Sequence, residues 1–83
     1  MGNRVRRDRL QIVYNILDVC TTETNKTAIV YRVNLNFRSI NPYLDLLIKN
    51  GLVEKNGSTI YKTTSNGVKL MKDIESIQNT LKF

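Results

Sequence analysis

The chain has 83 residues, of which 41% are hydrophobic, and this length allows one small domain with a modest core. Its 13 lysines and arginines against seven acidic residues give a formal charge of +6, which favours a polyanionic partner such as nucleic acid, although an ordinary basic soluble protein has a similar charge. One cysteine and no histidine exclude an internal disulfide framework, a Cys- or His-based zinc site, and Cys–His or Ser–His catalytic pairs.

The first predicted helix spans about residues 7–20. Its apolar residues recur on one helical face and form the expected core stripe, Leu10, Val13, Ile16, Leu17 and Cys20. Cys20 is interpreted as a small buried hydrophobe. The stripe follows the arginine cluster Arg4, Arg6, Arg7 and Arg9. This order superficially resembles a signal peptide, but polar residues interrupt the apolar run, so we expect a protein of the reduced cytoplasm.

A second, shorter helix is predicted over residues 26–33. The residues before it favour caps and turns, and either Thr24 or Asn25 can cap the helix. Because many of its residues are β-branched, its intrinsic propensity is poor and it needs tertiary packing. The residues expected to provide that packing are Ile29, Val30 and Val33.

The third predicted helix begins near Phe37 and is the most informative stretch of the chain. Its apolar residues follow spacings of 3, 4, 3 and 1, which places on one face Phe37, Ile40, Leu44, Leu47 and Ile48. The other face carries the hydrogen-bonding residues Arg38, Asn41, Asp45 and Lys49. A helix of this kind in a basic chain is what a reader of the DNA major groove needs.

Pro42 makes the start of this helix ambiguous. If Asn36 caps the helix, Pro42 falls in the second turn and removes one backbone hydrogen bond. If Ser39 caps it instead, Pro42 falls in the first turn, where proline is tolerated. We expect a helix that begins near Phe37 with a loosened or kinked first turn, because the apolar pattern already includes Phe37.

The third helix is expected to end at Gly51 in the left-handed conformation. Two strands are predicted over residues 52–55 and 59–63, and they are joined by the hairpin turn Asn56-Gly57-Ser58. Thr64 is expected to cap a last helix of about residues 65–82. This helix carries a short coiled-coil-like seam made of Leu70, Ile74, Ile77 and Leu81.

The predicted order is helix, helix, turn, helix, strand, hairpin, strand, helix. It is typical of a winged helix-turn-helix, here a mainly α single domain over residues 1–83 with a small β-hairpin wing and a C-terminal helix extension. The sequence resembles the small archaeal winged-helix family of stand-alone transcription regulators. The matching residues are Lys26-Thr27-x-Ile29, Asn34-Leu35, Tyr43-Leu44-x-x-Leu47, Gly51-Leu52-Val53 and Tyr61-x-x-Thr64-x-x-Gly67. The resemblance implies DNA binding and a homodimer through residues 70–81.

Phosphate neutralisation would supply most of the affinity for double-stranded DNA. The residues expected to contact phosphates are Arg4, Arg6, Arg7, Lys26, Lys55, Asn56, Ser58 and Lys62. Base reading is expected from Arg38, Ser39, Asn41 and Asp45, with the cap residue Asn36 beside them. Arginine suits guanine, asparagine suits adenine, and a carboxylate suits the cytosine amino group. Each residue has a plainer interpretation as solvated surface, helix cap or frayed terminus.

Three functions remain open at this point. The leading one is a homodimeric DNA-binding transcription regulator, and the others are a sequence-tolerant architectural DNA binder and a winged-helix module for protein–protein interactions. A DNA binder should present one positive face that contains Lys26, Arg38 and the wing, whereas a protein-binding module should present an apolar patch there. The sequence contains no phosphate-binding glycine loop, no recognisable acid–base pair and no apolar run of membrane length. We therefore expect neither an enzyme nor a bound cofactor, small-molecule ligand or membrane.

Overall fold

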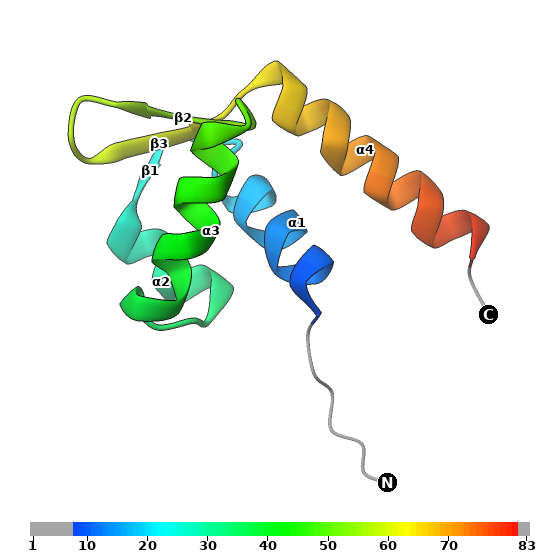
Figure 1. Ribbon diagram of the computed structural model, residues 1–83, viewed down its shortest axis with the longest axis horizontal. Coiled ribbons are helices and arrows are strands. Elements are labelled where there is room, and N and C mark those ends of the chain that lie inside the picture. Colours follow the sequence, from blue (N-terminus) through cyan, green and yellow to red (C-terminus); the bar gives the residue numbers. More distant parts are fainter. Residues whose placement is uncertain (1–7, 82–83) are drawn as a thin grey trace, which may run out of the picture.

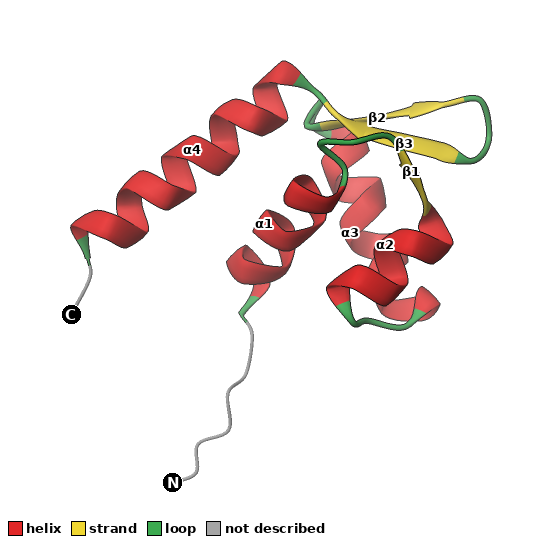
Figure 2. Cartoon of the chain, turned by 180° about the vertical axis from the view of Figure 1, so that it is seen from behind, coloured by secondary structure: helices red, strands yellow, loops and turns green. Residues whose placement is uncertain are grey.

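A computed structural model describes residues 8–81 (Figure 1). In chain order its elements are α1 (Arg9–Val19), β1 (Thr24–Asn25), α2 (Lys26–Val33), α3 (Phe37–Lys49), β2 (Val53–Asn56), β3 (Ile60–Thr63) and α4 (Ser65–Thr80). The strands form one antiparallel sheet in the order β1-β3-β2. The β2–β3 hairpin and α4 extend in opposite directions from the body formed by α1, α2 and α3 (Figures 1 and 2). This architecture confirms the predicted winged helix-turn-helix with a C-terminal helix.

Side-chain caps set where the helices begin. Asn25 caps α2, because its side-chain oxygen accepts a hydrogen bond from the N–H of Ala28 at 2.8 Å. Asn36 caps α3 in the same way by accepting from the N–H of Ser39 at 2.7 Å. The capping residue of α3 is therefore Asn36 and not Ser39, and α3 starts at Phe37 as predicted.

Pro42 lies inside α3, which remains continuous over 13 residues. Because proline has no N–H, the carbonyl of Arg38 lacks its usual helical donor four residues along. Arg38 is exposed, so water can satisfy that carbonyl at little cost. The first turn is closed by the hydrogen bond from the N–H of Ile40 to the carbonyl of Asn36 at 3.1 Å. The predicted loosening of this turn is therefore not observed.

Gly51 ends α3 with a φ of +72°, as the sequence predicted. Its N–H donates to the carbonyl of Ile48 at 3.0 Å, and the N–H of Leu52 donates to the carbonyl of Leu47 at 2.9 Å. This pair of bonds is the Schellman arrangement, which satisfies the last carbonyls of a helix. It turns the chain directly from α3 into β2, and so places the wing at the C-terminal end of α3.

The sheet contains one strand that the sequence analysis missed. The two residues of β1 pair with Tyr61 and Ile60 of β3, but two polar residues in a turn-like segment carry no alternation signal. β2 and β3 pair from Val53 opposite Thr63 to Asn56 opposite Ile60. The wing therefore consists of β2, β3 and the loop at residues 57–59, in which Gly57 has a φ of +63°.

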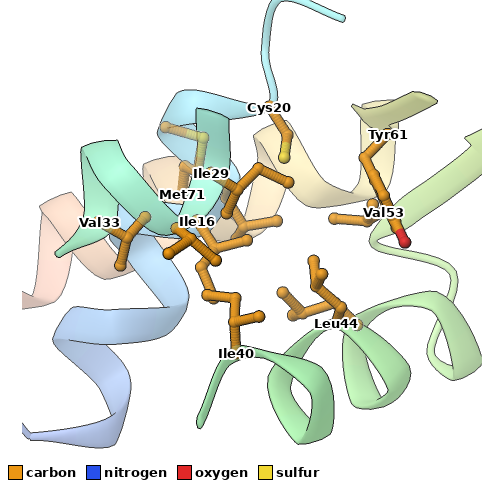
Figure 3. Close-up of a cluster of buried hydrophobic side chains, with 12 residues drawn as sticks. Ile16, Cys20, Ile29, Val33, Ile40, Leu44, Val53, Tyr61 and Met71 are labelled. Atoms are coloured by element: carbon orange, nitrogen blue, oxygen red, sulfur yellow. The ribbon is translucent and has the colours of Figure 1, made fainter. Parts of the chain in front are cut away.

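The core lies where the inner faces of α1, α2 and α3 meet the sheet and α4 (Figure 3). Its buried apolar residues are Ile16, Leu17, Cys20, Ile29, Val30, Val33, Ile40, Leu44, Leu47, Val53, Tyr61 and Met71. Figure 3 shows Ile40 and Leu44 of α3 reaching into this cluster. Two predicted core residues are in fact exposed, Leu10 by 46% and Phe37 by 48%. Both lie in the first turn of a helix, where the apolar period continues beyond the neighbouring elements that could bury it.

Gly67 allows α4 to approach the rest of the domain closely. A Cβ atom at this buried position would overlap the carbonyl oxygen of Leu52 and lie 2.5 Å from Cγ2 of Thr63. Thr63 is itself buried, and its hydroxyl donates to the carbonyl of Leu17 at 2.7 Å. The start of α4 is therefore tied to both the wing and α1.

Candidate nucleic-acid interface

The outer face of α3 carries the predicted base-reading residues. Arg38, Asn41 and Asp45 are all exposed, and their spacing of three and four residues makes them neighbours on one helical face. Ser39 is exposed too, but it lies about 100° around the helix from Arg38. Asn36 is exposed, although its side-chain oxygen is already engaged as the helix cap. The structure therefore brings Arg38, Asn41 and Asp45 together and separates Ser39 from them.

Lys26 connects the start of α2 to this face. Its ammonium donates a hydrogen bond to Oδ1 of Asn41 at 2.7 Å. Lys26 was expected to contact a phosphate and Asn41 to read a base, and the structure places the two side chains in direct contact. The sequence gives no signal for this contact, because the two residues are 15 positions apart on different helices.

A pocket of about 210 Å³ lies between the N-terminal end of α2 and the wing. The residues that line it are Asn25, Lys26, Thr27, Lys55, Ser58, Thr59 and Tyr61. The ammonium of Lys55 lies 5.6 Å from the centre of the Tyr61 ring, a cation–π distance that favours one position of the lysine over the pocket. Two lysines beside a helix N-terminus suit a phosphate group. Thus the structure groups three of the predicted phosphate contacts, Lys26, Lys55 and Ser58.

Lys62 does not line the pocket between α2 and the wing. Side chains alternate between the faces of a strand, and Tyr61 is buried whereas Lys62 is exposed. In the ladder Lys62 is paired with Glu54, and Lys55 is paired with Tyr61. Lys62 and Glu54 therefore lie on the face of the wing opposite to Lys55. Asn56 is exposed at the end of β2.

A second hollow, of about 460 Å³, runs beside the other flank of α3. Its lining residues are Arg9, Ser39, Pro42, Tyr43 and Leu46. Arg9 is the first residue of α1, so the N-terminal end of α1 lies next to α3. Arg9 belongs to the arginine cluster that was expected to act as an arm on DNA, and the structure places it in the lining of this hollow beside α3. Arg4, Arg6 and Arg7 lie outside the described residues.

Charge is distributed unevenly between the parts of the described chain. Residues 26–63, which form α2, α3 and the wing, contain six basic and two acidic residues. Residues 8–25 together with 64–81 contain three basic and five acidic residues. The positive charge of residues 8–81 is therefore concentrated in the elements that carry the candidate interface.

The predicted seam of α4 is divided between the core and the surface. Ile74 is 2% exposed within the single chain, and Leu70 packs against the core, so these two residues stabilise the domain itself. The prediction that Ile74 joins two copies of the chain is therefore wrong. It failed because α4 packs on α1, where the side chain of Tyr14 donates a hydrogen bond to Glu75. Ile77 and Leu81 remain 52% and 59% exposed.

Cys20 is buried, as the sequence predicted, and burial raises the pKa of its thiol to about 11. The hydrogen bond to Glu75 raises the pKa of Tyr14 above its ordinary value.

Within residues 8–81 no group of three or more Cys, Asp or Glu side chains is arranged to hold a metal ion. No helix in this part of the chain is long and apolar enough to span a membrane.

The sequence matches the family described as winged helix-turn-helix over residues 6–82. Two proteins of Methanocaldococcus jannaschii are similar to it. The uncharacterized protein MJ0287 is 33% identical over 74 residues, which cover 88% of this chain and 75% of that protein. The uncharacterized protein MJ0290 is 32% identical over 74 residues, which cover 88% of this chain and 35% of that protein. The chain thus spans three quarters of the first relative but about a third of the second.

Among solved structures, the chain is similar to the crystal structure of Sso10a-2, a DNA-binding protein from Sulfolobus solfataricus. The TM-score is 0.80 and the sequence identity is 28%, over 89% of this chain and 81% of the other. Because 89% of this chain is covered, the similarity concerns the architecture as a whole and not one motif.

Proposed function

This chain belongs to the winged helix-turn-helix family, and we propose that it is a double-stranded DNA-binding transcription regulator of the cytoplasm that acts as a homodimer. α3 would lie in the major groove, while the N-terminal end of α2, the wing and the N-terminal arginines would contact phosphates. The similarity to the DNA-binding protein Sso10a-2 supports DNA binding.

The observation that carries this proposal is the concentration of positive charge around an exposed helix. α2, α3 and the wing hold six of the nine basic residues found in residues 8–81 but only two of the seven acidic ones. Phosphate neutralisation is the main source of affinity for DNA. An interface that combines Lys26, Lys55 and Arg38 in this way favours a polyanion over a neutral or basic partner.

The exposed apolar residues of α3 favour DNA over a protein partner. Phe37 and Leu46 are 48% and 51% exposed. They are nine residues apart, which at about 100° per residue places them on opposite sides of the helix. A protein-binding surface would need them to form one continuous apolar patch. Between them lie the polar side chains Arg38 and Asp45, so the centre of the outer face is polar.

The homodimer in this proposal uses the exposed end of α4. Ile77 and Leu81 are four residues apart and more than half exposed, so they lie on one side of the helix and can pack against a second copy. Two related copies would place two α3 helices in successive major grooves, with half-sites about 34–36 Å apart.

Selection of bound duplexes from a random pool, followed by affinity measurements across a salt series, tests this function. A regulator should enrich a two-fold-related sequence and bind it about 10³-fold or more tightly than scrambled DNA. Binding to all duplexes with equal affinity would indicate an architectural DNA binder instead. Absence of DNA binding even at low salt, where phosphate contacts are strongest, would refute the proposal.

A further inference from the structure

The hydrogen bond between Lys26 and Asn41 determines which end of the Asn41 amide faces outward. The ammonium of Lys26 lies 2.7 Å from Oδ1 of Asn41. A lysine ammonium carries three donors and no acceptor, so an asparagine can meet it only with its oxygen. The other end of the amide, Nδ2 with its two N–H donors, is left for a ligand of the α3 outer face.

This orientation changes the base that Asn41 suits. In the usual pairing with adenine, an asparagine donates to N7 and accepts from the N6 amino group, so it needs its oxygen as well as its nitrogen. Lys26 occupies one of the two lone pairs of that oxygen, so the adenine amino group would have to approach the other lone pair beside a positively charged donor. Guanine presents two acceptors, N7 and O6, to the major groove. The outward N–H groups of Asn41 match these acceptors.

We propose that Lys26 is a specificity-determining residue, which holds Asn41 as a donor so that the protein selects guanine instead of adenine at the base that Asn41 contacts. This inference rests on the proposed DNA-binding function. It replaces the sequence-based expectation that Asn41 suits adenine. This arrangement is compatible with the phosphate contact expected of Lys26, because an ammonium that gives one donor to Asn41 retains two for the pocket shared with Lys55.

The experiment is selection from a random duplex pool with the full chain and four variants. Asn41→Ala identifies the base position, because discrimination should disappear at that position alone. Lys26→Met removes the donor while keeping the length of the side chain, and Lys26→Arg restores a donor without an acceptor. Lys55→Met is the matched control, since Lys55 lines the same pocket but its ammonium lies 5.6 Å from the centre of the Tyr61 ring. Thermal melts establish that each variant is folded before selection.

The original chain and Lys26→Arg should prefer guanine to adenine at the Asn41 position by about tenfold, within the usual discrimination of a good base contact. Lys26→Met should reduce or reverse this ratio, and Lys55→Met should weaken binding to all duplexes while leaving the ratio unchanged. The inference is overturned if Lys26→Met lowers every affinity by one factor and the guanine preference persists. It is also overturned if Asn41→Ala alters no position. Binding without any base preference would refute this inference but not DNA binding, whereas a loss of all DNA binding in the original chain would refute both.

Discussion

Replacing Ile74 of α4 by alanine should destabilise the folded monomer and should not separate two subunits. Ile74 is 2% exposed within the single chain, whereas Ile77, one turn further along the same helix, is 52% exposed. Truncating a buried isoleucine to alanine loses its transfer free energy and leaves a cavity, at a cost of about 2–5 kcal/mol. In the monomer, the same change at Ile77 removes about half as much buried surface and leaves no enclosed cavity, so at protein concentrations where the chain is monomeric we expect about 1 kcal/mol or less.

Thermal unfolding followed by circular dichroism measures the difference between these two variants. In a domain of this size, each kcal/mol lowers Tm by about 4–8 °C. Ile74→Ala should therefore lower Tm by at least about 8 °C, and Ile77→Ala by a few degrees at most. If Ile74→Ala does not fold, Ile74→Val provides the measurement, with an expected cost of about 0.5–1.5 kcal/mol. Melts are recorded at two protein concentrations, and light scattering gives the mass of each variant.

Two results would refute this reasoning. Equal, small losses of stability for Ile74→Ala and Ile77→Ala would mean that Ile74 is not part of the core. A change of mass in Ile74→Val with an unchanged, concentration-independent Tm would place Ile74 at a subunit interface. By contrast, Ile77→Lys should convert a dimer to a monomer while the domain stays folded, if the exposed end of α4 is the dimer contact.

Three further predictions concern other parts of the molecule. Arg38→Ala should weaken binding to selected DNA by about 1–3 kcal/mol if Arg38 reads a base. The control Arg32→Ala, at an exposed site on α2, should weaken that binding by a smaller amount. Equal affinities of the original chain and Arg38→Ala, measured by fluorescence anisotropy, would remove Arg38 from the interface. Gly67→Ala should destabilise the domain by about 1–3 kcal/mol, because its methyl group has no space beside Leu52; a Tm equal to or above that of the original chain would contradict this packing. Cys20 should react with a thiol reagent only as fast as the domain opens, and a fast reaction of the native protein at pH 8 would contradict its burial. Burial raises the pKa of its thiol from 9.0 to about 11. The stabilisation linked to the neutral thiol is therefore complete below about pH 9 and is lost as pH rises toward 11.

Local signals made much of this fold predictable. A cap such as Asn36 bonds to a backbone N–H three residues away, so both partners lie within one short stretch of sequence. The left-handed Gly51 and the hairpin around Gly57 are equally local. The inner face of α3 follows from its apolar period, because residues at that period must be buried together. For these reasons the bounds of α2 and α3 and the position of the wing agree with the prediction.

What the sequence could not supply is which elements meet. β1 has only two residues and is a strand because β3 lies beside it. Apolar residues at the helix starts, such as Leu10, follow the pattern of the core but have no neighbouring element to bury them.

The candidate site shows the same division between sequence and structure. The residue types that suit DNA, Arg38, Asn41 and Lys26 among them, are evident from the sequence, because charge and hydrogen-bonding capacity belong to each side chain by itself. The contact between Lys26 and Asn41 joins two helices, and the burial of Ile74 depends on how α4 packs against α1. Both depend on distances between segments that are remote in the chain. The sequence alone therefore determined the elements and their chemistry, and only the tertiary structure decided how those elements combine into an interface and a core.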